Sequence, residues 1–289
     1  MASLKEVKNR IKSVTSTRKI TSAMKLVASS KLHHAQVAIE SMLPYQKSLN
    51  KIMSTFLGEM KGEIESVYAE QRKVQKAVIV AYSSNSSLCG AFNTNVVKEV
   101  TQTIDSLKSE GVEEIQVIPI GAKIAEKVRK MGFPVQADNT HLLDRPNFNE
   151  AASIAQVLMD AFKAKEIDKV ILIYHHFHNT AKQVMTTETF LPVSLDVADT
   201  SQQPGQADYI VEPSKEELVA TLIPRVLYLK IYTALLDSCA SEHAARVIAM
   251  QTATDNADEL LHDLTLTYNK TRQAAITTEL LDIVGGSFQ

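Results

Sequence analysis

Apolar residues follow a helical spacing at both ends of the chain. Near the start they recur every three or four residues, in the order Leu4, Val7, Ile11 and Val14. A looser stripe of the same kind runs through 229–264, and neither Gly nor Pro interrupts residues 1–43 or 225–284. A continuous helix over the last of these stretches would be roughly 90 Å long. The pattern therefore predicts two long helices, at 1–58 and 214–285.

The two stripes are typical of the seam of an antiparallel coiled coil, but this seam is thin. Small or polar residues occupy or adjoin it where a self-sufficient zipper carries Leu or Ile, namely Thr17, Thr21, Ala28, Ala35, Ala253 and Ala257. Because isolated helices gain little from propensity alone, we expect this pair to rely on surrounding protein. A plain helical bundle is the alternative interpretation.

Between the two ends, short β-branched runs alternate with helical ones, which is typical of βαβ units and a parallel sheet. Strands are predicted at 77–82, 115–120, 169–174 and 183–193, and helices at 95–108, 122–130 and 147–165. Residues 196–213 are polar and indicate a linker or surface loop, after which Ser214 can cap the last helix. The predicted fold is α/β plus a long antiparallel coiled coil, in which the terminal helices form a rod and a Rossmann-like parallel-sheet domain, 75–195, is inserted between them.

Composition places the chain among ordinary globular proteins. Its formal net charge is −2 over 289 residues, with 45% hydrophobic and 22% charged residues, which argues against a dedicated nucleic-acid binder. Cys89 and Cys239 lie far apart, so neither a disulfide framework nor a zinc ribbon is indicated. The first residues are charged, and no stretch approaches the roughly 20 apolar residues that span a bilayer, so we expect a chain without a targeting or membrane segment.

Candidate chemistry is sparse. The first predicted strand leads into 83–90, which holds one glycine and neither a GxGxxG nor a GxxxxGK pattern, so nucleotide binding there is disfavoured. His176 and His178 share a strand face at a spacing that a metal could use, but the sequence shows no further ligands that would complete four. Cys89 could be a reactive thiol at a helix start, although a small buried side chain is the plainer interpretation. We predict no catalytic, cofactor or metal site.

Charge is distributed unevenly between the two ends. Residues 1–31 carry eight Lys and Arg against one Glu, whereas 255–282 carry six acidic residues against two basic ones. Opposite charges on two helices that pair antiparallel would help to set their register, at a modest energy per exposed pair. We expect the remaining positive charge to meet an acidic partner. A nucleic-acid stripe is the competing interpretation, but aromatic residues are not interleaved with these cations.

Several runs at the two ends are specific enough to compare with known families. The N-terminal runs are RIKSV (10–14), TRKITSAMKLVA (17–28) and SKL (30–32), and the C-terminal runs are ASEHAAR (240–246), AM (249–250), ATDNA (253–257), YNKTRQAAIT (268–277) and IVGG (283–286). With these runs the chain resembles the gamma subunits of rotary F-type ATP synthases, along its whole length. One departure is local: Asn85-Ser86-Ser87 stands where that family usually has Asp-Arg-Gly, and Ala91 replaces a glycine.

The resemblance implies a central shaft without a catalytic site, turning inside a hexamer of alternating alpha and beta subunits. The implied partners are those subunits, the epsilon subunit and the membrane ring of c subunits, with one copy of the chain per complex. It implies beta-subunit contacts at Arg10, Arg18, Lys19, Met24, Lys25, Arg272, Gln273 and Thr277. It implies contacts with the rotor ring or epsilon at Tyr209, Glu212, Ser87 and Leu88. In that case the cations near the start of the chain, Arg10, Arg18, Lys19 and Lys25, would form an electrostatic bearing against an acidic lever of the beta subunit.

The implied location is the cytoplasmic face of the bacterial inner membrane, where the chain would couple proton flow to ATP synthesis or hydrolysis. Two other classes stay open at this point. A free-standing α/β nucleotide-binding protein with coiled-coil arms would bind ATP in isolation, and a structural coiled-coil scaffold would form stable homodimers.

Overall fold

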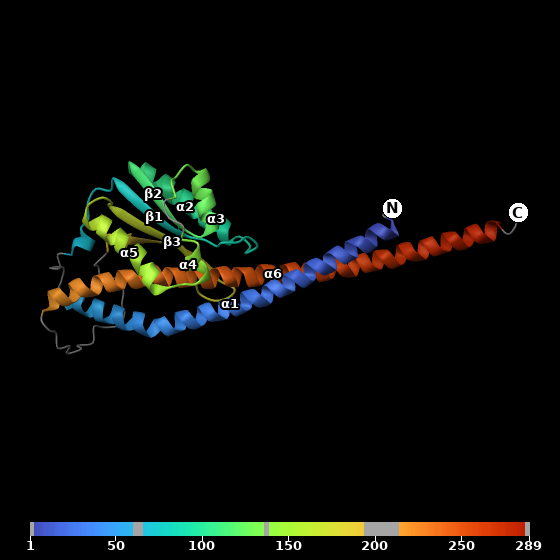
Figure 1. The fold of residues 1–289 in the computed structure, drawn as a ribbon, viewed down its shortest axis with the longest axis horizontal. Helices are drawn as coiled ribbons and strands as arrows, with labels where there is room; N and C mark the ends of the chain where they lie inside the picture. Colours follow the sequence, from blue (N-terminus) through green and yellow to red (C-terminus); the bar gives the residue numbers. More distant parts are fainter. Residues whose placement is uncertain (1–2, 60–65, 136–138, 194–213, 287–289) are drawn as a thin grey trace. The chain divides into compact units, whose positions relative to one another are not determined.

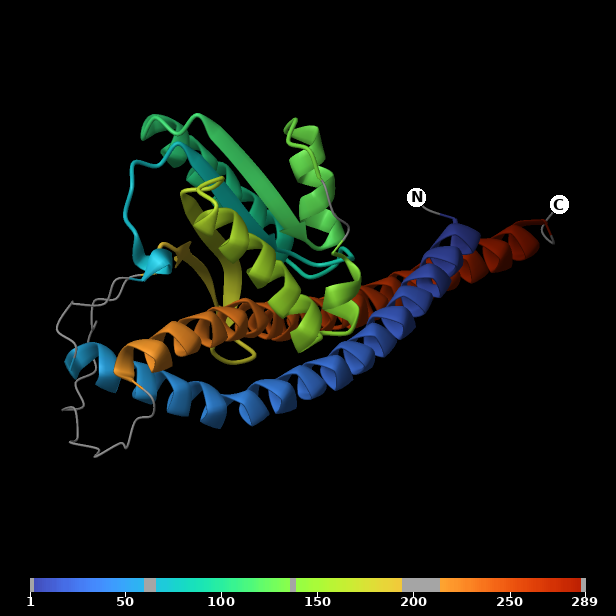
Figure 2. The same ribbon diagram turned by 60° about the vertical axis from the view of Figure 1, so that its left-hand side comes forward.

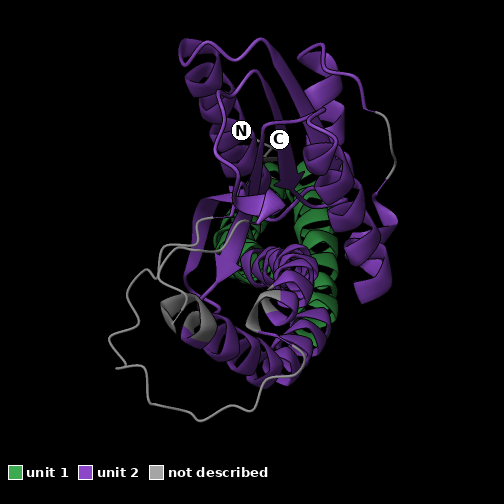
Figure 3. Ribbon diagram, turned by 90° about the vertical axis from the view of Figure 1, so that its left-hand side faces the viewer, with its two compact units in different colours: residues 1–30, 246–289 green, residues 31–245 purple. Residues whose placement is uncertain are grey.

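The computed structural model describes residues 3–59, 66–135, 139–193 and 214–286 (Figure 1). By their contacts these residues form two compact units, coloured separately in Figure 3. Unit 1 comprises residues 1–30 and 246–289, and unit 2 comprises residues 31–245.

Two long helices contribute residues to both units. Helix α1 covers Leu4–Glu59 and continues past Pro44, while α6 covers Lys215–Gly286 and continues past Pro224. The hydroxyl of Ser214 accepts a hydrogen bond from the backbone N–H of Glu217 at 3.2 Å, which confirms the predicted N-cap of α6. Among the described residues, no helix combines the length and the apolarity that a membrane crossing requires.

Four strands form the sheet of unit 2, in the order β2-β1-β3-β4. Their bounds are Lys76–Tyr82 (β1), Glu114–Ile120 (β2), Lys169–Phe177 (β3) and Gln183–Leu191 (β4). Strand β1 is parallel to β2 and β3, as predicted, whereas β4 is antiparallel to β3. The α/β fold class is therefore confirmed, with a mixed sheet in place of a wholly parallel one. The five residues between β3 and β4 are too few for the crossover that a parallel pair needs.

Shorter helices cover the sheet (Figure 2). They are α2 (Phe92–Ser109), α3 (Ala122–Lys130), α4 (His141–Asp144) and α5 (Phe148–Lys163), and a 3₁₀ turn, η1, covers Val67–Ala69. The side chain of Asn147 caps α5 by accepting from the N–H of Asn149 at 2.8 Å. Neither α4 nor η1 was predicted, because segments this short carry no detectable hydrophobic period.

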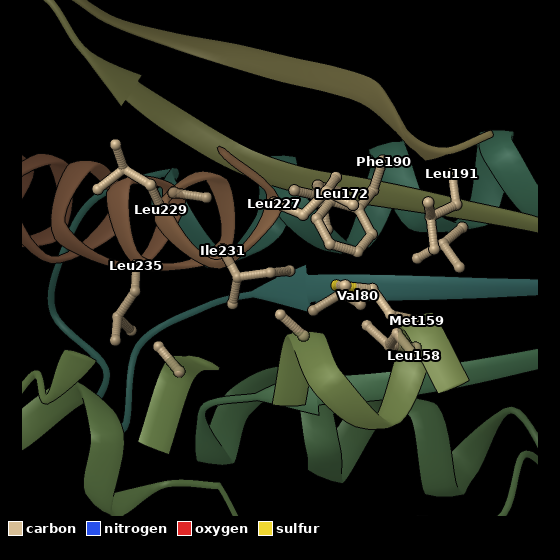
Figure 4. Packing of buried hydrophobic residues seen from close by; sticks show 14 of the residues in the cluster. Val80, Leu158, Met159, Leu172, Phe190, Leu191, Leu227, Leu229, Ile231 and Leu235 are labelled. Atoms are coloured by element: carbon tan, nitrogen blue, oxygen red, sulfur yellow. The ribbon is translucent and has the colours of Figure 1, made fainter. Parts of the chain in front are cut away.

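Both faces of the sheet are buried. Alternate side chains of β1, including Ile79 and Ala81, pack with α2 and α3 on one face. Val78, Val80 and Tyr82 pack on the other face with α5, α1 and α6. Figure 4 shows this second cluster, in which α6 contributes Leu227, Leu229, Ile231 and Leu235 against β1, β3, β4 and α5. The β-branched runs of the sequence are thus strands that are covered on two sides.

Candidate interaction surfaces

In unit 1 the paired helices bury few side chains. Among the described residues of this unit, the buried apolar ones are Val7, Ala28, Met250 and Ala257. Side-chain contacts join the helices: Thr21 Oγ1 lies 2.8 Å from Thr254 Oγ1, and Arg18 Nη1 lies 2.8 Å from Asp258 Oδ1. Both contacts fit an antiparallel pairing. Much of the remaining surface of both helices is therefore available to a partner.

The residues expected to contact a beta subunit all lie in unit 1. Most of them are exposed, namely Arg10, Lys19, Arg272, Gln273 and Thr277, while Met24 and Lys25 are half-buried. Arg18 differs, because its guanidinium is ion-paired with Asp258 within the chain. The sequence comparison could not reveal this pairing, since the two residues are 240 positions apart.

An apolar stretch of α6 was missed by the sequence analysis. Five large apolar side chains between positions 276 and 284 are 48–68% exposed: Ile276, Leu280, Leu281, Ile283 and Val284. The clustering of these residues near the end of the sequence could have predicted an interaction site. Exposed apolar groups gathered in one place mark such sites more often than isolated ones do.

Ser87 and Leu88 lie in an exposed loop that follows β1 in unit 2. Leu88 is 62% exposed and has a positive φ of 67°, a conformation that costs energy in a residue with a side chain. Asn93 holds the loop: its Oδ1 accepts from the backbone N–H of Ser84 at 3.0 Å, and its Nδ2 lies 3.2 Å from the sulfur of Cys89. The buried side of the loop is thus fixed while Leu88 points to solvent. Tyr209 and Glu212, the other two expected contacts at this end, lie outside the described residues.

A helix start that follows a strand can bind a phosphate through its free N–H groups, and α3 follows β2 in this way. Here the chain itself occupies the amides. The N–H of Ala122 donates to Asn85 Oδ1 at 3.1 Å, that of Lys123 to Ser84 O at 3.1 Å, and that of Ile124 to Ser83 Oγ at 3.0 Å. A phosphate would have to displace all three hydrogen bonds.

Gly121 shows how closely these segments approach. Its φ is +119°, and a Cβ at this position would lie 2.6 Å from Ser83 Oγ and 2.9 Å from a methyl carbon of Leu143. The loops after β1 and β2 are therefore packed closely against each other at Gly121, which disfavours a phosphate at the start of α3.

The three histidines near the end of β3 do not converge. His175 is buried and stacks on Phe92 with ring centroids 4.3 Å apart, and burial lowers the pKa of its imidazole to about 4. His176 is exposed, and its Nδ1 lies 2.5 Å from Asp237 Oδ2 on α6. Burial raises the pKa of the Asp237 carboxyl, against the opposing effect of His176. Within the described ranges, no three His, Cys, Asp or Glu side chains are grouped closely enough to hold a metal ion.

Both cysteines are buried thiols. Burial raises the pKa of Cys239, whose sulfur lies 3.7 Å from the carbonyl oxygen of Leu143. Cys89 packs at the base of the 83–93 loop, 3.7 Å from Ser84 Oγ. Burial favours a packing role for both thiols, since a reactive thiolate needs exposure.

Taken together, these features define an α/β protein with a long antiparallel helix pair, most of whose surface in unit 1 is exposed and accessible to other chains. The sequence profile of the ATP synthase family matches residues 3–288. The chain is 54% identical over 288 residues to an ATP synthase gamma chain of Phocaeicola vulgatus, covering 99% of each chain. It is 56% identical over 289 residues to that of Bacteroides fragilis, again covering 99% of each.

Solved structures agree with this assignment. A chain from the central stalk and c-ring of the Tetrahymena thermophila mitochondrial ATP synthase matches with a TM-score of 0.56 and 26% identity, over 81% of this chain and 99% of that one. A chain from the Euglena gracilis mitochondrial enzyme shares the fold with a TM-score of 0.67 and 20% identity, over 99% and 93%. The chain therefore belongs to the ATP synthase gamma-chain family, whose members are non-catalytic subunits of the central stalk.

Proposed function

We propose that this chain couples transmembrane proton flow to ATP synthesis or hydrolysis by rotating, as one copy, inside a hexamer of alternating alpha and beta subunits. The observation that carries the proposal is the full-length identity of more than half to chains named as ATP synthase gamma chains. The exposed helix pair of unit 1 supports it, because a shaft must offer its surface to a surrounding ring. We place the complex at the cytoplasmic face of a bacterial inner membrane.

The different charges of the two helices explain how rotation of the shaft would act on the catalytic sites. The stretch of α1 in unit 1 carries mostly cations, and the stretch of α6 in unit 1 carries mostly acidic residues. A ring with near-threefold symmetry therefore meets a different surface of the shaft at each of its three catalytic sites. Each orientation favours a different site conformation through its contact free energy, and rotation moves the three conformations around the ring.

The contacts with the beta subunits are assigned to two places. On α1 we assign exposed Arg10 and Lys19, with half-buried Met24 and Lys25 beside them, to the passage of an acidic lever. On α6 we assign Arg272, Gln273 and Thr277 to a polar grip; Thr277 lies one turn beyond Gln273, and its hydroxyl donates to the Gln273 carbonyl at 2.9 Å. Arg18 joins the bearing only in part, since Asp258 neutralises it.

The contacts with the epsilon subunit and the ring of c subunits are assigned to unit 2. Exposed Ser87 and Leu88 are the described candidates, and Tyr209 and Glu212 complete the proposal. The fixed, exposed side chain of Leu88 supports this assignment, because a partner that covers it would recover the apolar surface now in water.

Reconstitution with purified alpha and beta subunits tests the proposal. We expect a complex with one copy of the chain by native mass, and an ATPase rate well above that of the two subunits alone. Failure to form that complex with competent subunits would contradict the proposal and favour a free-standing protein.

Charge reversal tests the bearing in the same assay. Arg10→Glu with Lys19→Glu should lower proton-driven ATP synthesis several-fold in vesicles, and the loss should shrink as salt screens the charges. Lys47→Glu with Lys98→Glu is the matched control, because it reverses two exposed lysines of unit 2. Equal activity of the two double variants would refute the bearing and leave the shaft assignment intact.

A further inference from the structure

The heptad seam of α1 in unit 1 has an apolar part and a polar part. Leu4, Val7, Ile11 and Val14 occupy its first four positions, and Arg18, Thr21 and Lys25 occupy the next three before Ala28. Polar residues at three consecutive seam positions weaken a coiled coil, because these positions normally bury aliphatic side chains. The polar part must therefore contribute something other than apolar burial.

The hydroxyl groups of Thr21 and Thr254 form a complete hydrogen-bond chain across this seam. Thr21 is 8% exposed, and its Oγ1 lies 2.8 Å from Thr254 Oγ1. Thr254 Oγ1 also reaches the carbonyl oxygen of Met250 at 2.8 Å, and Thr21 Oγ1 reaches that of Arg18 at 3.0 Å. Each hydroxyl has one proton, so one hydroxyl donates across the seam and the other donates to its own helix. This pairing uses both hydroxyl protons and adds a hydrogen bond between the two helices to the bonds that each hydroxyl can make within its own helix.

The Arg18–Asp258 ion pair lies one turn away and fits the same pairing. Arg18 precedes Thr21 by three residues and Asp258 follows Thr254 by four, as an antiparallel register requires. The pair is partly exposed, with 40% and 53% of the two side chains accessible, so its energy is small. It is nevertheless directional, because a shift of either helix separates the charges.

A slip by one helical turn would break both contacts. It would place Thr21 level with Asp258 or with Met250, and Arg18 level with His262 or with Thr254. Two of the buried apolar residues near the polar part, Ala28 and Ala257, resist such a slip poorly because they are small, which leaves Met250 as the large buried side chain there. A polar pair in a seam is a known means of fixing register at a cost in stability.

We propose that Thr21–Thr254 and Arg18–Asp258 together form a register lock, which fixes the axial position of α1 against α6 in unit 1. The four residues are positioning residues. Through the lock, the cations on α1 and the polar grip on α6 keep a constant axial offset while the helix pair works. This functional consequence rests on the proposed rotor function, whereas the lock itself does not.

Spin-label distances in the full chain test the lock directly. Cys residues are introduced at exposed Ser30 and Lys270, many turns apart along the pair, while Cys89 and Cys239 are buried and resist labelling. The unmodified seam should give a single distance. Thr21→Val with Thr254→Val should raise the population of a second distance, displaced by about 5 Å, roughly fivefold.

Four further variants keep the test independent of folding defects. Thr21→Ser with Thr254→Ser retains the hydroxyl groups and should keep the single distance. Arg18→Asp and Asp258→Arg should each populate the second distance, and their combination should restore the first. A valine variant that keeps the single distance, or a charge swap that fails to restore it, overturns the lock.

Coupling in the reconstituted complex tests the functional consequence separately. The valine variant should lower ATP synthesis more than ATPase activity, and the serine variant should change neither. A shifted register with normal coupling would retain the lock and refute its role in the rotor. Failure of every variant and of the unmodified chain to assemble would instead refute the proposed function.

Discussion

Helix α6 runs through two contrasting environments. In unit 2 its side chains are buried on several sides by the sheet, α5 and α1, with Ile231, Leu235 and Ala240 almost inaccessible to water. In unit 1, of the described side chains between 246 and 284, three are buried: Arg246, Met250 and Ala257. One continuous helix thus serves as part of a core over one stretch and as an open surface over the next.

Polar contacts repeat the contrast. In unit 2, α6 is bonded to the sheet at several points: Tyr82 donates to the carbonyl of Ile231 at 3.2 Å, Lys230 lies 3.1 Å from Glu188, and Ser241 donates to the carbonyl of His175 at 3.1 Å. Tyr228 adds a hydrogen bond to Gln156 of α5. In unit 1 the side-chain contacts across the seam include the two of the register lock, Thr21–Thr254 and Arg18–Asp258. Unit 2 is therefore stabilised by its own packing, and we infer that unit 1 depends on its partners.

The largest expected difference between the two units comes from the same Leu→Ala substitution at two points of α6. Leu235→Ala, at a position that is 1% exposed, should lower the free energy of unfolding by about 3 kcal/mol, because it leaves a cavity. Leu260→Ala, at a position that is 47% exposed, should cost less than about 0.5 kcal/mol. Urea unfolding of the full chain, followed by circular dichroism, measures both. Equal losses would show that unit 1 has a core of its own.

Acid should destabilise unit 2 through His175. Burial lowers the pKa of this imidazole to about 4 in the folded chain, against 6.5 for an ordinary histidine. The unfolded chain therefore binds the proton first, and stability present above pH 6.5 is lost as the pH falls towards 4. Between pH 7 and pH 5 this loss amounts to about 2 kcal/mol.

Comparison with a leucine variant isolates that effect from other titrating groups, including Asp237, whose raised pKa acts in the opposite direction. His175→Leu should flatten the pH dependence of the melting temperature between pH 7 and pH 5. His178→Gln, at an exposed position, should leave it unchanged. A His175→Leu curve parallel to that of the unmodified chain would assign the acid sensitivity elsewhere.

The sequence predicted what local pattern determines. The β-branched runs gave β1, β2 and β3 because strands buried on both faces must be apolar throughout, and the stop-free stretches gave α1 and α6. The prediction of a parallel sheet missed the antiparallel β4, because a five-residue connection decides its direction and the β-branched pattern does not. The partner of Arg18 was invisible for a similar reason: Asp258 becomes its neighbour only once the register of two distant helices is known.

An Arg→Lys change in each unit gives the smallest expected difference in unfolding free energy, and it tests the polar contacts alone. In unit 2, Arg72 donates to the carbonyls of Phe162 and Ile167 at 2.9 and 2.5 Å, pairs with Asp168 at 2.8 Å, and lies over the Phe162 ring at 4.3 Å. Lysine cannot reproduce this planar set of bonds. In unit 1, Arg18 makes a single exposed ion pair that lysine can retain.

We therefore expect Arg72→Lys to cost about 1–2 kcal/mol of unfolding free energy and Arg18→Lys less than about 0.5 kcal/mol. Burial would raise the pKa of Asp168, but the N–H groups of Lys76 and Gln75 and the Arg72 guanidinium outweigh it and lower that pKa. Stability from this carboxylate is present at neutral pH and lost as the pH falls through its lowered pKa, so Arg72→Lys should reduce the loss in acid. Urea titrations at pH 7 and pH 4 measure both effects. If the two arginines prove equally replaceable, the polar contacts of unit 2 contribute no more than those of unit 1, and apolar burial alone separates the two regions.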